Sequence, residues 1–360
     1  MKIKTKFTIS WIVGSLLAIL TAYDISLSML PWSPTIIDQC FNSDTLRVAY
    51  TNMSPTLDRV LCFYVHFNQQ PLHDIVGLPL MRLLMAALGT CYAIMAFEGS
   101  RKGFKTSTLM VAFPLLGVLA SMIGISLMFP AVWIPLCFYS YKQKEPKGED
   151  LSLSMPEAYG ILLGIVVGYG VPSAIIASPL VTNDSRLEQD LLCFWQVISV
   201  IIVPLFGVFE RAIKKIGSPV DQVKQPAVRE RLRLVEGKDA LERCYLFLGA
   251  LNMVIYYGSY VFTVHQGIHI WDSFLFLLNA PGSLPAGLSF LDLGKIICSR
   301  MILVDYISLS FAFVLWATLN SGMVAGLLVF IATPIIGPAA AISFYSYYRE
   351  SKINYAIKAD

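Results

Sequence analysis

Long apolar runs, separated by short polar segments, dominate this chain. Eight such runs lie near residues 8–29, 76–97, 107–129, 156–178, 188–209, 244–264, 301–319 and 323–345. Each is long enough to cross a bilayer as a helix, and a helix satisfies its own backbone hydrogen bonds in lipid. The pattern therefore predicts an all-α fold, a polytopic transmembrane helix bundle that forms one domain over residues 1–360.

A shorter amphipathic segment interrupts this pattern at residues 56–70, TLDRVLCFYVHFNQQ. It is apolar on one side and too short to span a bilayer comfortably, so we expect a half-helix that dips into the bundle. A ninth crossing by the same segment is the alternative.

The longest polar stretch, residues 210–243, carries nine basic residues: Arg211, Lys214, Lys215, Lys224, Arg229, Arg231, Arg233, Lys238 and Arg243. The positive-inside rule places this loop in the cytosol. Within it, Val228, Leu232 and Val235 form an apolar stripe that predicts an interfacial amphipathic helix. Eight crossings would then put both termini outside, whereas the basic start MKIKTK favours an N-terminus inside. A ninth crossing would remove this conflict.

Three glycines recur every four residues in the 156–178 run, at positions 160, 164 and 168. The segment GIVVGYG superficially resembles a nucleotide-binding loop, but no strand precedes it. The spacing instead predicts a face on which another helix packs closely.

The composition excludes most soluble classes of protein. The chain is 56% hydrophobic and only 14% charged, with a mean hydropathy of +0.64. A disordered chain, a disulfide scaffold or a nucleic-acid-binding module would need more charge or more cysteine. The seven cysteines stand singly, with no metal-ligand or redox spacing, so we interpret them mainly as small hydrophobic residues.

No local catalytic motif is present: the chain lacks a P-loop, HExxH and GxSxG. It also lacks the aspartate-rich motifs that hold magnesium against a diphosphate, so terpenoid chemistry here would not begin with loss of diphosphate. His265 and His269 stand four residues apart, but no third ligand is in view, and we interpret them as interfacial residues. We therefore expect no metal and no cofactor.

Ionisable residues inside apolar helices mark candidate sites, because each is costly to insert into a membrane. Asp305, in MILVDYISLSF, is the clearest of these. Asp24, Arg82 and Asp190 lie nearer to helix ends, where side chains reach water. The alternative for Asp305 is a structural ion pair with Arg82 or Arg300.

Aromatic and polar residues near these groups are numerous enough to line a pocket. They are Trp195, Gln196, Asn252, Tyr256, Tyr257, Tyr260 and Trp316. For most of them, packing or anchoring at the membrane interface is the simpler interpretation.

The run LDRVLCFYVHFNQQPLHDIVGLPLMRLLMAALGTCYAIMAFEGSRKG, which begins at Leu57, contains a Leu-Asp opening, an aromatic half-helix, a proline and a helix that ends in Glu-x-x-Arg-x-Gly. FWQ at 194–196, LVDY at 303–306 and LW at 315–316 follow later. This order resembles the fungal integral-membrane terpene cyclases of meroterpenoid pathways over most of the chain. The chain is also similar to the integral membrane proteins of indole-diterpene mycotoxin clusters, of the paxilline biosynthesis protein A type.

The resemblance implies a multi-pass protein of the endoplasmic reticulum that cyclises an epoxy-isoprenyl chain on an aromatic or indole head. An epoxide is a weak base, so its proton donor must be a carboxylic acid that burial keeps protonated, either Asp305 or Glu98. Arg101 would hold Glu98 in place, or ionise it and so remove it from this role. The expected substrate pocket comprises Trp195, Gln196, Tyr256, Tyr257, Trp316 and Arg101, whose aromatic faces would stabilise a carbocation.

Asn68 and Gln69 stand where the family has an acidic residue after the aromatic half-helix. This departure favours an alternative, a non-catalytic membrane scaffold that gathers pathway enzymes or holds a lipophilic prenylated intermediate. A transporter is a weaker alternative, because no internal repeat is evident. The expected partners are the lipid bilayer, that intermediate and other pathway enzymes, but no nucleic acid.

Two sequons, Asn52-Met-Ser and Asn183-Asp-Ser, are candidates for glycosylation. With nine crossings both would lie in the lumen, and the chain would be a glycoprotein.

Overall fold

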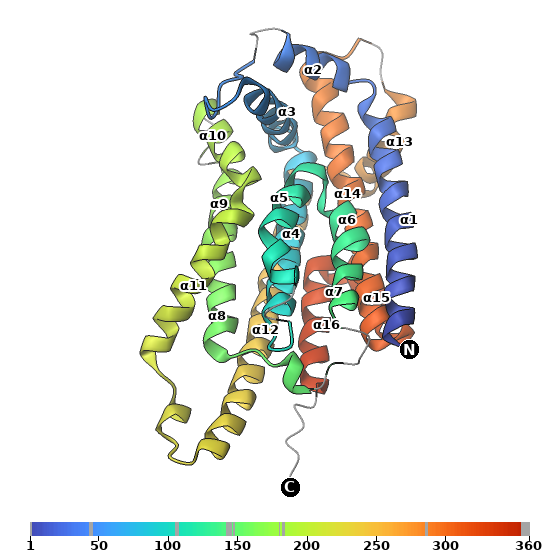
Figure 1. The fold of residues 1–360 in the computed structure, drawn as a ribbon. Helices are drawn as coiled ribbons and strands as arrows, with labels where there is room; N and C mark the ends of the chain where they lie inside the picture. The colour runs from blue at the N-terminus through green and yellow to red at the C-terminus, as the bar shows by residue number, and fades with distance from the viewer. Residues whose placement is uncertain are drawn as a thin grey trace.

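The computed structural model describes the chain except residues 1, 43–45, 105–107, 142–145, 147, 180, 182–183, 285–286 and 354–360. The described part is all-α, without strands (Figure 1). Its longer helices are α1 (Ile3–Met29), α3 (Pro55–Leu72), α4 (Gly77–Ser100), α5 (Thr108–Ile123), α11 (Ile198–Ile216), α12 (Pro226–His265) and α14 (Phe290–Ser321).

The shorter helices connect, extend or cap the long ones. They are α2 (Ser33–Phe41), α6 (Ile125–Met128), α7 (Ile134–Ser140), α8 (Met155–Ile165), α9 (Val171–Ile176), α10 (Ser185–Gln196), α13 (Ile270–Ser283), α15 (Met323–Ile336) and α16 (Pro338–Lys352). Two π-helical turns, Phe129–Trp133 and Val166–Gly170, join α6 to α7 and α8 to α9. Two 3₁₀ turns cover Gly148–Leu151 and Pro219–Gln222.

Among the described residues, five helical segments are long and apolar enough to cross a membrane: Ile3–Met29, Gly77–Ser100, Gly148–Ile176, Pro226–His265 and Phe290–Ser321. The pair α10 and α11, bent by 70° at their junction, adds a sixth if it is counted as one span. These helices are compatible with a multi-pass membrane protein. The predicted eight or nine spans are not reproduced, because two of the predicted runs form helical hairpins.

The predicted run 107–129 is divided by a turn. Helix α5 ends at Ile123, and Gly124 adopts a φ of +114°, a conformation that L side chains rarely adopt. The chain then reverses, and α6 and α7 run back beside α5 (Figure 1). Each arm has 16 residues at most, roughly 24 Å of helix, which is shorter than the ~30 Å bilayer core. The run is therefore a helical hairpin rather than a crossing.

The predicted run 323–345 is divided in the same way. Helix α15 ends at Ile336, Gly337 has a φ of +85°, and α16 begins at Pro338. Its arms have 14 and 15 residues, again too short to span the core. Helices α15 and α16 pack against each other and against α12 and α14.

These hairpins resolve the conflict between the charge pattern and the number of crossings. The start of α1, the α11–α12 connection and the end of α16 lie at one end of the bundle, as expected if the bent pair counts as a sixth span (Figure 1). Lys238 of α12 donates hydrogen bonds to the carbonyl groups of Ser351 and Ile353, so the first part of α12 contacts the end of α16. No ninth crossing is needed, and α3 lies at the opposite end beside α2 (Figure 1).

The basic residues after position 226 belong to a long helix rather than to a separate one. Helix α12 has 40 residues, roughly 60 Å, about twice the thickness of the bilayer core. Its first part therefore extends the span beyond the bundle (Figure 1). Val228, Leu232 and Val235 are exposed on it. The predicted apolar stripe thus lies on the first part of α12, and its position at the membrane interface stays a prediction.

The glycine face of α8 and its π-helical extension packs against α11, as the four-residue spacing predicts. A Cβ atom on Gly160 would lie 2.9 Å from the backbone nitrogen of Glu210. A Cβ on Gly164 would lie 2.5 Å from the Phe206 ring, and one on Gly168 would lie 2.7 Å from Ile202. Only glycine permits this close contact, so the packing interpretation is confirmed.

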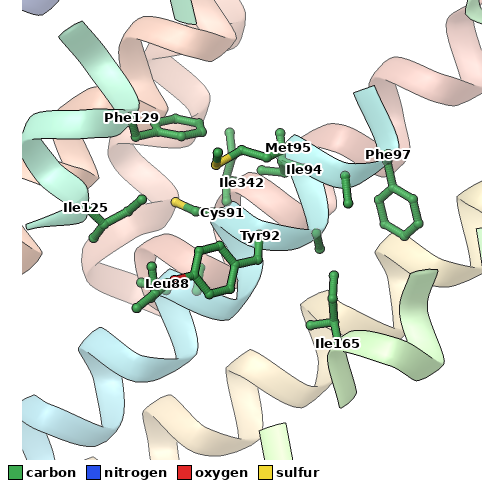
Figure 2. Packing of buried hydrophobic residues seen from close by; sticks show 14 of the residues in the cluster. Leu88, Cys91, Tyr92, Ile94, Met95, Phe97, Ile125, Phe129, Ile165 and Ile342 are labelled. Atoms are coloured by element: carbon green, nitrogen blue, oxygen red, sulfur yellow. The ribbon is translucent and has the colours of Figure 1, made fainter. Parts of the chain in front are cut away.

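Helix α4 is the centre of the apolar core. All its residues from Ala87 to Ser100 are buried. Leu88, Cys91 and Met95 face Ile125 and Phe129 of the first hairpin, while Phe97 points away from them (Figure 2). The first hairpin thus packs against α4 within the bundle.

One disulfide bond joins α2 to α3, between Cys40 and Cys62. Our interpretation of the cysteines as mainly small hydrophobic residues therefore does not apply to this pair. The two residues are 22 positions apart, so their spacing in the sequence gave no indication of a bond. The other five cysteines are free thiols, of which Cys193 is half-buried and the rest are buried.

Candidate functional site

A cavity lies between α3, α4, α14 and the turn between α5 and α6. Its volume is about 90 Å³. Its walls are mainly apolar and aromatic and include Tyr64, Phe67, Asn68, Met81, Met85, Leu88, Ser121, Gly124, Trp195, Met301 and Asp305. Concave, mainly apolar sites with few polar groups are typical of sites that bind small molecules.

Asp305 is the one carboxyl group among the residues that line this cavity. It is 9% exposed and lies near the middle of α14. The hydroxyl and the backbone N–H of Ser126 both donate to its Oδ1 atom, the second over 3.3 Å. Both contacts reach Oδ1, which leaves Oδ2 for another partner.

The glycine turn explains this geometry. Because Gly124 turns the chain, Ser126 stands in the first turn of α6 with its backbone N–H pointing at α14. A Cβ atom on Gly124 would lie 3.1 Å from Asp305 Oδ1. The turn therefore fits closely around the carboxyl group.

The structural alternative for Asp305, an ion pair with Arg82 or Arg300, is wrong. Arg300 binds Asp24 over 2.7 Å, and Arg82 donates to the carbonyl of Ala177 over 2.9 Å. Within the described part of the chain, Asp305 has no ion pair. A buried carboxyl group without a counter-charge favours its neutral, protonated form.

Other polar groups of the cavity are engaged in local hydrogen bonds. The Asn68 amide donates to the Tyr64 carbonyl over 2.8 Å, within α3. Trp195 donates to the Ser173 hydroxyl over 3.0 Å, and Ser121 donates to the Gly117 carbonyl over 3.1 Å. Asn68, which replaces the acidic residue of the resembled family, thus lies in the same cavity as Asp305.

Glu98 belongs to a different cluster of four charges, in which Glu98, Arg101 and Glu350 are fully buried and Arg349 is partly buried. Both of its oxygens are bound by Arg101, over 2.7 and 2.9 Å, and by Arg349, over 2.6 and 3.4 Å. Arg101 also binds Glu350 and donates to the carbonyl of Leu151. Two guanidinium groups hold a carboxylate in its charged form, so Glu98 is not suited to donate a proton.

Comparison with known proteins supports a family assignment. A model of the CtvD domain matches residues 38–353. The chain belongs to the CtvD domain family. This family is associated with fungal meroterpenoid and terpenoid pathways, which makes the chain a protein of a fungal secondary-metabolism family. No curated protein and no solved structure matches the chain. The CtvD match includes every wall of the cavity except Ile25 of α1.

Several predicted pocket residues of this CtvD domain lie away from Asp305. Trp316 packs between Trp133 and Phe138 beside the charge cluster, with Arg349 over its ring. Tyr256 and Tyr257 donate to the carbonyls of Pro334 and Ile335 and so hold the second hairpin.

The remaining predicted pocket residues also lie outside the cavity. Gln196 is fully buried at the bend between α10 and α11, and neither of its polar side-chain atoms has a partner among the described residues. Asn252 donates to the Thr90 hydroxyl over 2.8 Å, and Tyr260 is exposed. Of the predicted substrate pocket, only Trp195 joins Asp305.

The sequence did not identify Ser126, Gly124 or the methionines that line the cavity as parts of the site. A signal was present, since Gly124 and Ser126 interrupt an apolar run at one point, as a turn would require. The methionines gave no signal, because their side chains fit any apolar environment.

The two histidines and one of the two sequons lie in the described part of the chain. No group of ligating residues that could hold a metal occurs in the described part of the chain, and His265 and His269 are exposed. Asn52 is exposed with a φ of +56°, at the same end as the disulfide. Asn183 lies outside the described residues.

Proposed function

We propose that this chain is a membrane-bound, terpene cyclase-like protein of the endoplasmic reticulum, which cyclises an epoxy-isoprenyl chain attached to an aromatic or indole head. The observation that carries this proposal is the Asp305 carboxyl group, buried without a counter-charge in an apolar cavity. The CtvD domain match supports the pathway class.

Proton transfer begins the reaction. Asp305 donates the proton on Oδ2 to the epoxide oxygen, the C–O bond breaks, and positive charge develops on the carbon atom. The two Ser126 hydrogen bonds at Oδ1 stabilise the resulting carboxylate. A double bond of the isoprenyl chain then attacks the cationic carbon. At the end of the ring-forming sequence the last cation returns a proton to the Asp305 carboxylate, which restores the acid.

The walls of the cavity suit a cationic intermediate. Tyr64, Phe67 and Trp195 present aromatic rings, and each favourable contact with a cation contributes roughly 0.5–2 kcal/mol. The sulfur atoms of Met81, Met85 and Met301 are polarisable. These apolar walls also limit access of water, which would otherwise capture the cation.

One observation favours a second candidate function. Asn68 supplies no acid, and no second carboxyl group lines the cavity among the described residues. A cavity of this kind suits a protein that only holds a lipophilic prenylated intermediate for neighbouring pathway enzymes.

The experiment compares Asp305→Asn with the wild type in microsomes supplied with an epoxidised prenyl substrate. The variant should accumulate normally, yet lose conversion by a factor of about 10²–10⁴, because an amide cannot replace a general acid. Asp190→Asn is the matched control. Asp190 pairs with Arg47 outside the cavity, so this variant should keep full conversion.

Full conversion by Asp305→Asn would contradict the assigned role of Asp305. Equal substrate binding by wild type and variant, with no conversion by either, would favour the holding function. Glu98→Gln should instead fail to accumulate, because it leaves Arg101 and Arg349 without their shared carboxylate.

A further inference from the structure

The Asn68 side chain lines the Asp305 cavity and is only 7% exposed. Its amide nitrogen donates to the carbonyl of Tyr64, four residues earlier in α3, over 2.8 Å. Because a carbonyl oxygen only accepts hydrogen bonds, this contact fixes which end of the amide is the nitrogen. The other end, Oδ1, therefore points away from the backbone of α3. Within the described part of the chain, no group donates to Oδ1.

Two other polar groups of the wall are already paired. The Ser121 hydroxyl and the Trp195 N–H donate to groups outside the lining, over 3.1 and 3.0 Å. Asp305 Oδ2 and Asn68 Oδ1, by contrast, have no partner among the described residues. A neutral carboxyl group donates through its proton, whereas an amide oxygen only accepts. The cavity thus offers a ligand a donor from α14 and an acceptor from α3.

The proposed substrate has one part that can satisfy the acceptor. An epoxide oxygen carries no hydrogen, so it pairs with the Asp305 carboxyl group and not with Asn68 Oδ1. The isoprenyl chain has no polar hydrogen either. The head supplies one, as an indole N–H or a phenolic O–H group. Tyr64 and Phe67 precede Asn68 in α3 and also line the cavity, so their rings give a flat head an aromatic surface.

We infer that Asn68 binds the aromatic head of the substrate by accepting a hydrogen bond from its indole N–H or phenolic O–H group. This inference rests on the proposed function for the class of ligand. Asn68 is a specificity-determining residue, because a head without the donor would leave a buried oxygen unpaired. An amide suits this role better than a carboxylate, since it accepts without a charge and does not take a proton from the cation.

The test measures binding to the purified full chain in detergent by isothermal titration calorimetry. The compounds carry no epoxide, so they cannot be cyclised. A prenylated indole is compared with the prenylated benzofuran of the same shape, in which an oxygen atom replaces the N–H group. A prenylated phenol is compared with the corresponding prenylated benzene. The wild type should bind the donor compound of at least one pair about tenfold more tightly. The pair that shows this preference identifies the head.

Asn68→Leu should bind both members of the preferred pair equally. Asn320→Leu is the matched control, because the Asn320 amide makes the same hydrogen bond to a carbonyl four residues earlier, over 2.8 Å, outside this cavity. This control should keep the tenfold preference. If Asn68→Leu does not accumulate, the comparison of compounds on the wild type decides the inference by itself.

Equal binding within both pairs by the wild type, binding of none of the four compounds, or an unchanged preference in Asn68→Leu would overturn the inference. Failure of the proposed cyclisation gives a different result. Preference for the donor compounds without conversion of the epoxidised substrate would support the role of Asn68 and contradict cyclisation. Conversion without this preference would support cyclisation and contradict the role of Asn68.

Discussion

Glu98 and Asp305 are two buried carboxyl groups whose surroundings give them different chemistry. Glu98 is bound by two guanidinium groups, whereas Asp305 accepts hydrogen bonds only from Ser126 among the described residues. Burial alone therefore does not identify a proton donor. What matters is whether the buried acid has a cation beside it. By this criterion Asp305 is a candidate acid and Glu98 ties α4 to α16.

A third acid, Glu188, predicts a pH dependence of stability through its partner His73. The His73 ring lies 2.9 Å from the Glu188 carboxylate, which also accepts from Gln69. This hydrogen bond raises the pKa of His73 above its ordinary value of 6.5, although partial burial and Lys295 act in the opposite direction. The pair therefore stabilises the fold fully below pH 6.5, and this contribution is lost as pH rises through the raised pKa.

We expect the melting temperature to fall by about 1–2 °C between about pH 6 and pH 9, since His73 is 39% exposed and solvent screens the pair. In His73→Gln, which keeps a donor but does not titrate, this part of the decline should be absent. Thermal unfolding of both proteins across the pH series measures it. Parallel curves for the two proteins would contradict the assignment.

At the scale of single residues, the sequence indicated which residues are candidates for function, but not which of them lie close together in the fold. Asp305 was recognisable because a charge inside an apolar helix is costly, and Trp195 does lie in the same cavity. The sequence could not exclude Tyr256, Trp316 and Gln196 from this cavity, because a single sequence does not show which face of a helix packs against which neighbouring helix. Those contacts arise from packing between segments far apart in the chain.

In this protein, a single glycine with a positive φ turns an apolar run into a helical hairpin in place of one long helix. Most predicted runs form helices close to the expected residues, because apolar length dictates a helix in lipid. The runs 107–129 and 323–345 are equally apolar, but Gly124 and Gly337 adopt positive φ and reverse the chain. Hydropathy averages over a window and cannot register one turn residue. The count of crossings was therefore the part of the fold that sequence did not determine.

The role of Gly124 in the turn between α5 and α6 predicts that a side chain at this position destabilises the fold. Gly124→Ala combines a strained φ of +114° with a Cβ atom 3.1 Å from Asp305 Oδ1. We expect a loss of about 1–3 kcal/mol in stability, measured by thermal unfolding in detergent. Gly258→Ala, in the middle of α12 with nothing within 4 Å of the new Cβ, is the matched control and should be neutral or stabilising. Equal melting of Gly124→Ala and the wild type would contradict the turn.

At the scale of the whole molecule, two independent features indicate the same orientation. The basic residues gather at the end that holds the start of α1 and the end of α16 (Figure 1). The Cys40–Cys62 bond lies at the opposite end, and disulfide bonds persist in oxidising compartments. We therefore propose that the basic end faces the cytosol and the disulfide end faces an oxidising compartment.

Two cysteine variants test this orientation. Ile216→Cys lies at the end of α11, next to the α11–α12 connection, where the native side chain is 83% exposed. Met53→Cys lies at the disulfide end, where the native side chain is 85% exposed. In sealed microsomes with their cytosolic face outward, a membrane-impermeant maleimide should label Ile216→Cys directly. Met53→Cys should need permeabilisation. The reverse labelling pattern would show that the bundle has the opposite orientation in the membrane.

The Cys40–Cys62 bond also sets a condition for producing this protein in a foreign host. It fastens α2 to α3, and α3 supplies Tyr64, Phe67 and Asn68 to the cavity wall. A bacterial inner membrane offers an oxidising periplasm on the correct side, whereas cell-free synthesis with added thiol does not. Reduction of the bond would free one wall of the cavity. Preparations intended for substrate assays should therefore be kept free of reductant from translation onward.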